Sequence, residues 1–289
     1  MAITAPTKTS DLSGFIDPVQ AEYIFERGAR NSVVQQLVRR VPLGPSGTRI
    51  PVITTRPQAA WVGEGERKPA TAGAITPKSI EPKKIAAIMV DSAEVIRLNP
   101  AAFIERMRDG LAEAFAIGFD RAALHDEGPG GAAGDGPFST YVGQTTKVQE
   151  LGGTSQANGG IFVDLKEAMS DIVTTGRRYQ LTGWALDSVV EPLLWGSVDT
   201  TGRPIWTDLP VDENAPAISS AGRLLGRQSY MGEGVASANL TSVVGFGGDW
   251  TQAAWGAVGG ISYRISTEAP VTINGSLVSL FENNLVAIL

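Results

Sequence analysis

Two pairs of neighbouring carboxylates and one histidine are the side chains of this sequence that stand out as candidate acids or bases. Glu64 and Glu66 alternate within a charged segment, and Asp126 and Glu127 directly follow His125. Two carboxylates can share the acid and base roles of a hydrolase when both line a cleft. The sequence has a single histidine and no cysteine, so thiol catalysis, cysteine-ligated zinc and nearly all histidine metal sites are excluded.

Neither carboxylate pair lies in a pattern that predicts an active site. Glu64 and Glu66 belong to an exposed excursion without a cleft, and His125 is expected at a helix end, where a structural role is favoured. The glycine-rich run at 128–133 looks like a dinucleotide fingerprint, but it contains a proline and follows a helix rather than a strand. We therefore predict no catalytic, cofactor-binding or metal-binding residues. A carboxylate-dependent hydrolase of α+β type stays as the alternative from another class, with a soluble binding module as a third.

The composition predicts a folded, acidic protein of one or two domains. Of its 289 residues, 43% are hydrophobic, which is enough to bury a core. The net charge of -6 is opposite in sign to that of a basic nucleic-acid-binding domain. No signal peptide is recognisable, and the longest apolar run, at 85–90, is too short to span a bilayer. The cytosol is the default compartment.

The N-terminal region predicts an arm followed by short helices. Residues 1–16 are polar and without pattern, and Asp17 before a proline is typical of a helix start. Ser32 and Gln35 match a capping box, which predicts a second helix that continues to Val41.

A charged ribbon and a long helix follow. Strands are expected at 49–54 and 59–62, within a two-stranded excursion that has too few aliphatic residues for a core of its own. Because an isolated ribbon is marginal in water, it should lie against another surface. Residues 83–90 read as a strand entering a buried sheet, and apolar residues at helical spacing predict a helix over 100–125.

The C-terminal half alternates weaker signals. After a glycine-rich connection at 128–160, we expect a helix capped by Asp164 and Glu167, a strand at 184–186, a helix at 188–195 capped by Ser188 and Glu191, strands within 222–246, and a terminal apolar strand at 285–289. A strand this apolar must insert into an existing sheet.

Several segments together resemble a known family. The stretch Trp61-Val-Gly-Glu-Gly-Glu-Arg-Lys-Pro69 and the returning segments 82–85 and 90–92 are similar to those of the major capsid proteins of tailed bacteriophages. Segments 201–204, 224–226 and 245–250 resemble axial-domain landmarks of the same family. Each motif is weak alone, but their order and spacing cover nearly the whole chain.

The resemblance implies an α+β protein with the Hong Kong 97-like capsid fold. Its parts would be an N-terminal arm with short helices (1–45), an extended E-loop (46–84), a peripheral domain with a spine helix at 100–125 and a connecting loop (85–154), an axial domain (155–250), and C-terminal strands that return to the peripheral domain (251–289). The ribbon without a core, the isolated long helix and the terminal strand agree with this implication.

The function implied by the resemblance is self-assembly into the icosahedral head shell of a tailed phage around double-stranded DNA. Heterologous contacts between subunits would close into rings and then a shell. We expect Trp61 to anchor the ribbon on a neighbouring subunit. Glu64, Glu66, Arg67 and Lys68 would form ion pairs across subunits and set the register of the contact.

The expected partners follow from the same resemblance. They are further copies in hexamers and pentamers, a portal, a decoration protein, and packaged DNA bound without sequence specificity; no membrane is involved. The helical signal begins at Asp17, which leaves no room for a long scaffolding segment, so a separate scaffolding protein is expected. Assembly would occur in the host bacterial cytoplasm, and the protein would reside in the virion.

Two variations within this fold bear on the interpretation. An encapsulin-type nanocompartment shell is the nearest alternative, and the phage-like E-loop argues against it. Some capsid proteins form Lys–Asn crosslinks between subunits. Candidate residues for such a crosslink lie in plausible regions, although no motif distinguishes them; they are Lys68, Lys78, Asn283 and Asn284.

Overall fold

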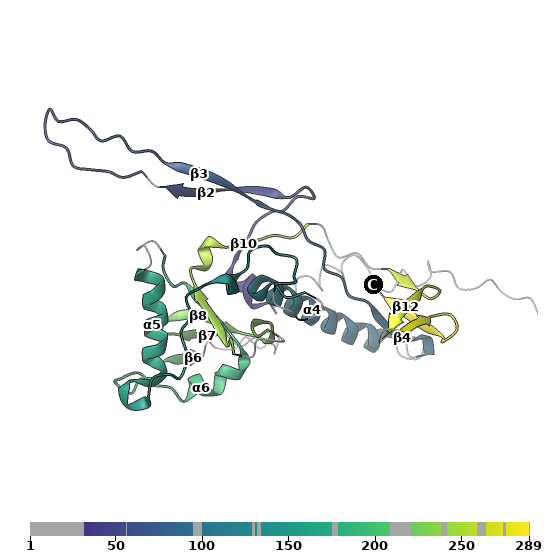
Figure 1. Cartoon of the computed structure of the whole chain (residues 1–289). Coiled ribbons are helices and arrows are strands. Elements are labelled where there is room, and N and C mark those ends of the chain that lie inside the picture. Colours follow the sequence, from purple (N-terminus) through teal and green to yellow (C-terminus); the bar gives the residue numbers. More distant parts are fainter. Residues whose placement is uncertain are drawn as a thin grey trace, which may run out of the picture. The chain divides into compact units, whose positions relative to one another are not determined.

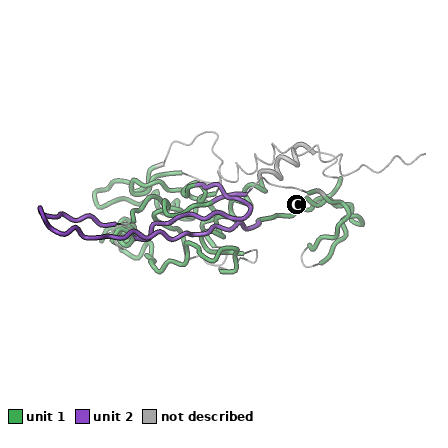
Figure 2. The backbone as a smooth tube through the Cα atoms, turned by 90° about the horizontal axis from the view of Figure 1, so that it is seen from above, with its two compact units in different colours: residues 1–39, 85–255, 260–289 green, residues 40–84, 256–259 purple. Residues whose placement is uncertain are grey.

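The computed structural model describes residues 32–55, 57–94, 100–128, 131, 134–174, 179–208, 221–237, 242–258, 264–273 and 276–288. The chain divides into two compact units, drawn in different colours in Figure 2. Unit 1 comprises residues 1–39, 85–255 and 260–289, and unit 2 comprises residues 40–84 and 256–259. The expected arm and the helix starting at Asp17 lie outside the described residues.

Unit 2 is built on a long antiparallel ribbon. β2 (Thr48–Thr55) pairs with β3 (Ala74–Ile80), from Thr48 opposite Ile80 to Thr55 opposite Ala74, and an extended loop joins the strands (Figure 1). The strand predicted at 49–54 is confirmed. The strand predicted at 59–62 is wrong, because residues 57–63 have no partner strand within the described chain.

In unit 1, the short helix α2 (Val33–Leu37) begins as predicted and ends early. The Ser32 hydroxyl accepts a hydrogen bond from the Gln35 N–H at 3.1 Å, which confirms the N-cap. The predicted continuation to Val41 is wrong, because Val38 is extended and its carbonyl accepts the indole N–H of Trp255 at 3.1 Å. The chain then enters β1 (Arg39–Arg40), which pairs with β10 (Ala254–Trp255).

The long helix α4 (Pro100–His125) has the predicted bounds. Along residues 110–125, its buried apolar side chains are small or aliphatic and include Ala112, Ala116 and Leu124. Small side chains allow neighbouring elements to approach the helix closely. α2 and two 3-10 turns, η2 (Val142–Gln144) and η5 (Glu233–Val235), contact it.

A small sheet brings together distant parts of unit 1. β14 (Leu285–Ile288) lies between β11 (Ile265–Ser266) and β4 (Met89–Ser92), antiparallel to both. The predicted insertion of the terminal strand into a sheet is confirmed. The strand predicted at 83–90 is wrong over most of its length, since residues 81–88 are unpaired and pairing starts at Met89. A separate hairpin is formed by β12 (Pro270–Ile273) and β13 (Ser276–Ser279).

The largest sheet has five strands in the order β6-β7-β8-β5-β9. These are β6 (Trp206–Asp208), β7 (Ala221–Leu224), β8 (Arg227–Met231), β5 (Gly183–Leu186) and β9 (Gly245–Gly248). β5 is parallel to β8, whereas the other neighbouring pairs are antiparallel. The strands expected at 184–186 and within 222–246 are confirmed. The turn η6 (Trp250–Gln252) follows β9.

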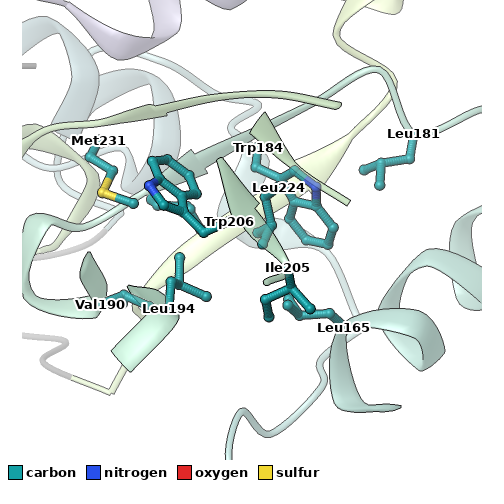
Figure 3. Packing of buried hydrophobic residues seen from close by; sticks show 10 residues of the cluster. Leu165, Leu181, Trp184, Val190, Leu194, Ile205, Trp206, Leu224 and Met231 are labelled. Carbon is teal, nitrogen blue, oxygen red and sulfur yellow. The ribbon is translucent and has the colours of Figure 1, made fainter. Parts of the chain in front are cut away.

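Helices α5 (Gly160–Thr174) and α6 (Glu191–Trp195) supply side chains to the core of this sheet. Leu165 of α5 and Leu194 of α6 pack with Trp184, Trp206 and other strand residues (Figure 3). The two indoles need space on the sheet, and glycines provide it. A Cβ at Gly222 would collide with the Trp206 ring, and one at Gly247 would collide with the Trp184 ring.

The predicted caps of both helices are wrong. α5 begins at Gly160, directly after the turn η3 (Gln156–Asn158) and Gly159, which has a positive φ, so Asp164 lies inside the helix. Its carboxylate accepts the Gly152 N–H at 2.7 Å instead. The second helix starts as the 3-10 turn η4 (Ser188–Val190), capped by Asp187 rather than Ser188.

Candidate functional site

The ribbon of unit 2 carries exposed apolar residues in regular positions. Ile53 and Ile75 lie opposite each other across β2 and β3, and they are 50% and 66% exposed. Directly opposed β-branched residues pack against each other and stabilise a sheet. Half or more of each side chain remains exposed, and this apolar area would be buried if another surface covered it. This pair was not among the residues predicted from the sequence.

The segment between the strands contains all the predicted interaction residues. Trp61 is fully exposed, at 105% relative accessibility. Glu64 lies in a turn with Gly65, whose φ is 84°, and the Glu66 carboxylate accepts the Gly63 N–H at 3.2 Å. The Glu66 N–H in turn donates to the Gly63 carbonyl at 3.2 Å. Glu66 therefore shapes this turn as well as carrying charge.

Arg67 and Lys68 follow the turn and are exposed. The structure thus collects Trp61 and the four charged residues in one segment, with one large aromatic beside both signs of charge. No ion pair joins these charges to one another among the described residues. Such a segment has the chemistry of a contact surface: an indole to be buried, and charges that orient the partner.

The other candidate acids and bases have structural surroundings. His125 is 2% exposed; its Nε2 lies 2.9 Å from the Val235 carbonyl, and its ring meets Phe246 edge-on. Asp126 has a positive φ of 51°, and its carboxylate accepts the Phe138 N–H at 2.7 Å, which orders the following loop. Glu127 is also buried. Within the described residues, no group of three His, Asp or Glu side chains could hold a metal ion.

Asp120 on α4 is a buried carboxylate that the sequence analysis did not single out. It accepts hydrogen bonds from the Ser32 hydroxyl at 2.5 Å, from the Val33 N–H at 2.7 Å and from the Val34 N–H at 3.1 Å. Burial raises the pKa of Asp120 to about 6, although these hydrogen bonds lower it. The carboxylate ties the N-terminus of α2 to α4. Because 88 residues separate Ser32 from Asp120, no local pattern could reveal this link.

Comparison with known proteins identifies the family. The chain matches the phage capsid family over residues 14–289. It is 37% identical over 294 residues to the "probable major capsid protein" of Mycobacterium phage L5, covering 98% of this chain and 86% of that relative. The corresponding protein of Mycobacterium phage D29 is 36% identical over 288 residues, with the same coverage.

A solved structure from Gordonia phage Cozz is similar with a TM-score of 0.65 and 21% sequence identity, covering 89% of this chain and 79% of that one. This likeness confirms the predicted α+β, Hong Kong 97-like capsid fold. The hydrolase and binding-module alternatives fall away, because the matched family is structural. The chain belongs to the phage capsid family, and it is a major capsid protein of the virion rather than an enzyme.

Proposed function

We propose that the chain builds the icosahedral head shell of a tailed phage by laying its ribbon on a neighbouring copy, within hexamers and pentamers. The observation that supports this proposal most directly is the full exposure of Trp61, in the segment that joins two largely exposed strands. An exposed indole contributes no burial energy to the isolated chain, so its exposure favours a role in a contact with another surface. A neighbouring subunit would supply the missing surface, and repeated heterologous contacts would close the shell.

Trp61 is the proposed anchor of this contact. Complete burial of an aromatic side chain of this size contributes roughly 2–3 kcal/mol, and such anchors dominate interface energies. Glu64, Glu66, Arg67 and Lys68 flank the anchor and would pair with charges of the neighbour. Exposed pairs of this kind add little affinity, so their proposed role is to set register.

The proposed domain boundaries follow the predicted ones: arm 1–45, E-loop 46–84, peripheral domain 85–154 with return strands 251–289, and axial domain 155–250. Strand pairing supports this division. β4 from the first peripheral segment shares a sheet with β11 and β14 from the last. All five strands of the β6-β7-β8-β5-β9 sheet fall within the axial range.

The remaining partners are proposed from the family. They are a separate scaffolding protein, a portal, a decoration protein and packaged DNA bound without sequence specificity, with assembly in the host bacterial cytoplasm. None of the described helices has the length and apolarity needed to cross a membrane. An encapsulin-type shell differs in what it encloses, so the contents of purified particles discriminate the two: DNA supports the phage head, and an enclosed enzyme supports the alternative.

Trp61→Ala tests the proposed anchor. The variant should fold like the wild type, since the Trp61 side chain is fully exposed, but should give at least tenfold fewer shells by light scattering and negative-stain microscopy. Val148→Ala is the matched control, because Val148 is an apolar residue 81% exposed in a loop of unit 1. Normal shells from Trp61→Ala would contradict the anchor.

A further inference from the structure

The charges of this chain are divided unequally between its two units. Unit 2 has eight Lys and Arg residues against three Glu and no Asp, a net charge of +5. Unit 1 has sixteen basic residues against twenty-seven acidic ones, a net charge of -11. The overall charge of -6 is therefore the sum of a basic unit 2, which contains the ribbon, and an acidic unit 1, called the body below.

Positive charges are exposed on both paired strands of the ribbon. Arg49 of β2 and Lys78 of β3 are exposed, and they occupy adjacent rows of the register, because Arg49 lies opposite Ser79 and Lys78 opposite Ile50. Adjacent rows face opposite sides of a sheet, so each face of the paired strands carries one of these positive charges. Exposed carboxylates of unit 1 are spread over many elements: Glu94, Asp135, Glu150, Glu167, Glu268 and Glu282.

We propose that the surface receiving the ribbon is the acidic unit 1 of a second copy, and that this charge division selects a head-to-tail contact. The inference rests on the proposed role of the ribbon in assembly. Two acidic bodies repel each other, as do two basic ribbons, whereas a ribbon and a body attract. An isologous body-to-body dimer is therefore disfavoured, and the heterologous contact that builds rings is favoured.

A protein surface fits the ribbon better than nucleic acid does. Arg49 shares a face of the ribbon with Ile53, because the two are separated by an even number of residues, and Ile53 and Ile75 form an exposed apolar pair there. Phosphates would neutralise the charge but leave these aliphatic side chains without an apolar counterpart. Unit 1 offers both kinds of group: Phe281, 79% exposed, directly precedes the exposed Glu282.

Attraction between opposite net charges acts mainly on the rate of encounter. Complementary fields raise association rates by about 10- to 1000-fold at low ionic strength, and the gain disappears as salt shortens the screening distance to about 3 Å at 1 M. Shell assembly should therefore slow by at least about tenfold between low and high salt, and this dependence should follow the charge of the ribbon.

Two double variants with the same net charge test this inference. Arg49→Glu/Lys78→Glu reverses two charges on the ribbon, and Lys147→Glu/Lys166→Glu reverses two exposed charges on unit 1. Each pair changes the net charge of the chain from -6 to -10. Assembly is followed by light scattering of the full chain against NaCl concentration, under conditions in which the wild type forms shells.

The ribbon variant should assemble at least tenfold more slowly at low salt, with a flattened salt dependence. The body variant should assemble at least as fast as the wild type, because its body is more acidic. Equal slowing of both variants would overturn the inference, since only net repulsion would then matter. Equal rates for the wild type and both variants would also overturn it.

Two further outcomes separate this inference from its alternatives. If Trp61→Ala blocks assembly while the charge variants behave alike, the ribbon contact stands and its electrostatic selection is wrong. If Trp61→Ala assembles normally, the ribbon contact itself fails. If the ribbon variant assembles normally but loses retention of a short DNA duplex in a binding assay, the positive charge serves nucleic acid, and the inference is wrong.

Discussion

At the scale of single residues, Asp120 makes subunit stability depend on pH. Its folded pKa of about 6 lies above the ordinary value of 3.8, so the folded chain keeps a proton over a range in which the unfolded chain has lost it. The stabilisation linked to this proton is complete below pH 3.8 and is lost as the pH rises through about 6. The loss amounts to at most about 3 kcal/mol.

Asp120→Asn provides the measurement. The amide cannot titrate, so urea unfolding of the unassembled variant should show a flatter pH dependence between pH 4 and 7 than the wild type. The amide nitrogen of Asn would face backbone N–H donors. The free energy of unfolding of the variant at pH 4 should therefore be about 1–3 kcal/mol lower than that of the wild type. Ser32→Ala removes a contact that lowers the pKa and should shift the wild-type loss to higher pH. Identical pH profiles for wild type and Asp120→Asn would show that another group is responsible.

Adjacent glycines of β9 give a second residue-scale prediction. A Cβ at Gly247 would lie 2.5 Å from Cζ3 of Trp184, whereas a Cβ at Gly248 would meet nothing within 4 Å. Gly247→Ala should therefore lower the free energy of unfolding by about 1–3 kcal/mol through overpacking. Gly248→Ala should change it by less than about 0.5 kcal/mol. Thermal unfolding of both variants compares the same substitution one residue apart, and equal effects would contradict the packing argument.

At the scale of elements, the central position of β14 makes it the critical strand of its sheet. Val286 is 6% exposed, and its strand pairs on both sides with β4 and β11. Val286→Asp would bury an unpaired carboxylate, so it should destabilise the subunit by more than about 3 kcal/mol. Leu277→Asp on β13 is the control, because Leu277 is 73% exposed. Soluble yield and unfolding midpoint should fall for Val286→Asp alone.

At the scale of the whole molecule, the proposed ribbon contact predicts protection on assembly. Trypsin should cleave the bond after Arg67 rapidly in unassembled chains, where this residue is exposed. In shells the neighbouring copy would cover the bond, and cleavage measured by mass spectrometry should slow by at least tenfold. Dissociated shells should become sensitive again. Equally fast cleavage in intact shells would place the turn outside any subunit contact.

The sequence alone determined the features that depend on near neighbours. The helix at 100–125 was predicted with its bounds, because helical hydrogen bonds and apolar spacing are local. The ribbon was predicted from its shortage of aliphatic residues, and its segment contains Trp61 and the charged candidates. The order and spacing of the motifs also led to the correct family.

Tertiary structure decided what distant residues do to one another. A strand exists only where a partner lies beside it, so residues 59–62 and most of 83–90 stay unpaired while β14 joins β4 across nearly 200 residues. Helix boundaries differ from the predicted ones for the same reason. The Trp255 indole N–H donates to the Val38 carbonyl, and the Gly152 N–H donates to the Asp164 carboxylate. Hydrogen-bond partners far apart in the sequence outweighed the local capping signals, and no local pattern encodes them.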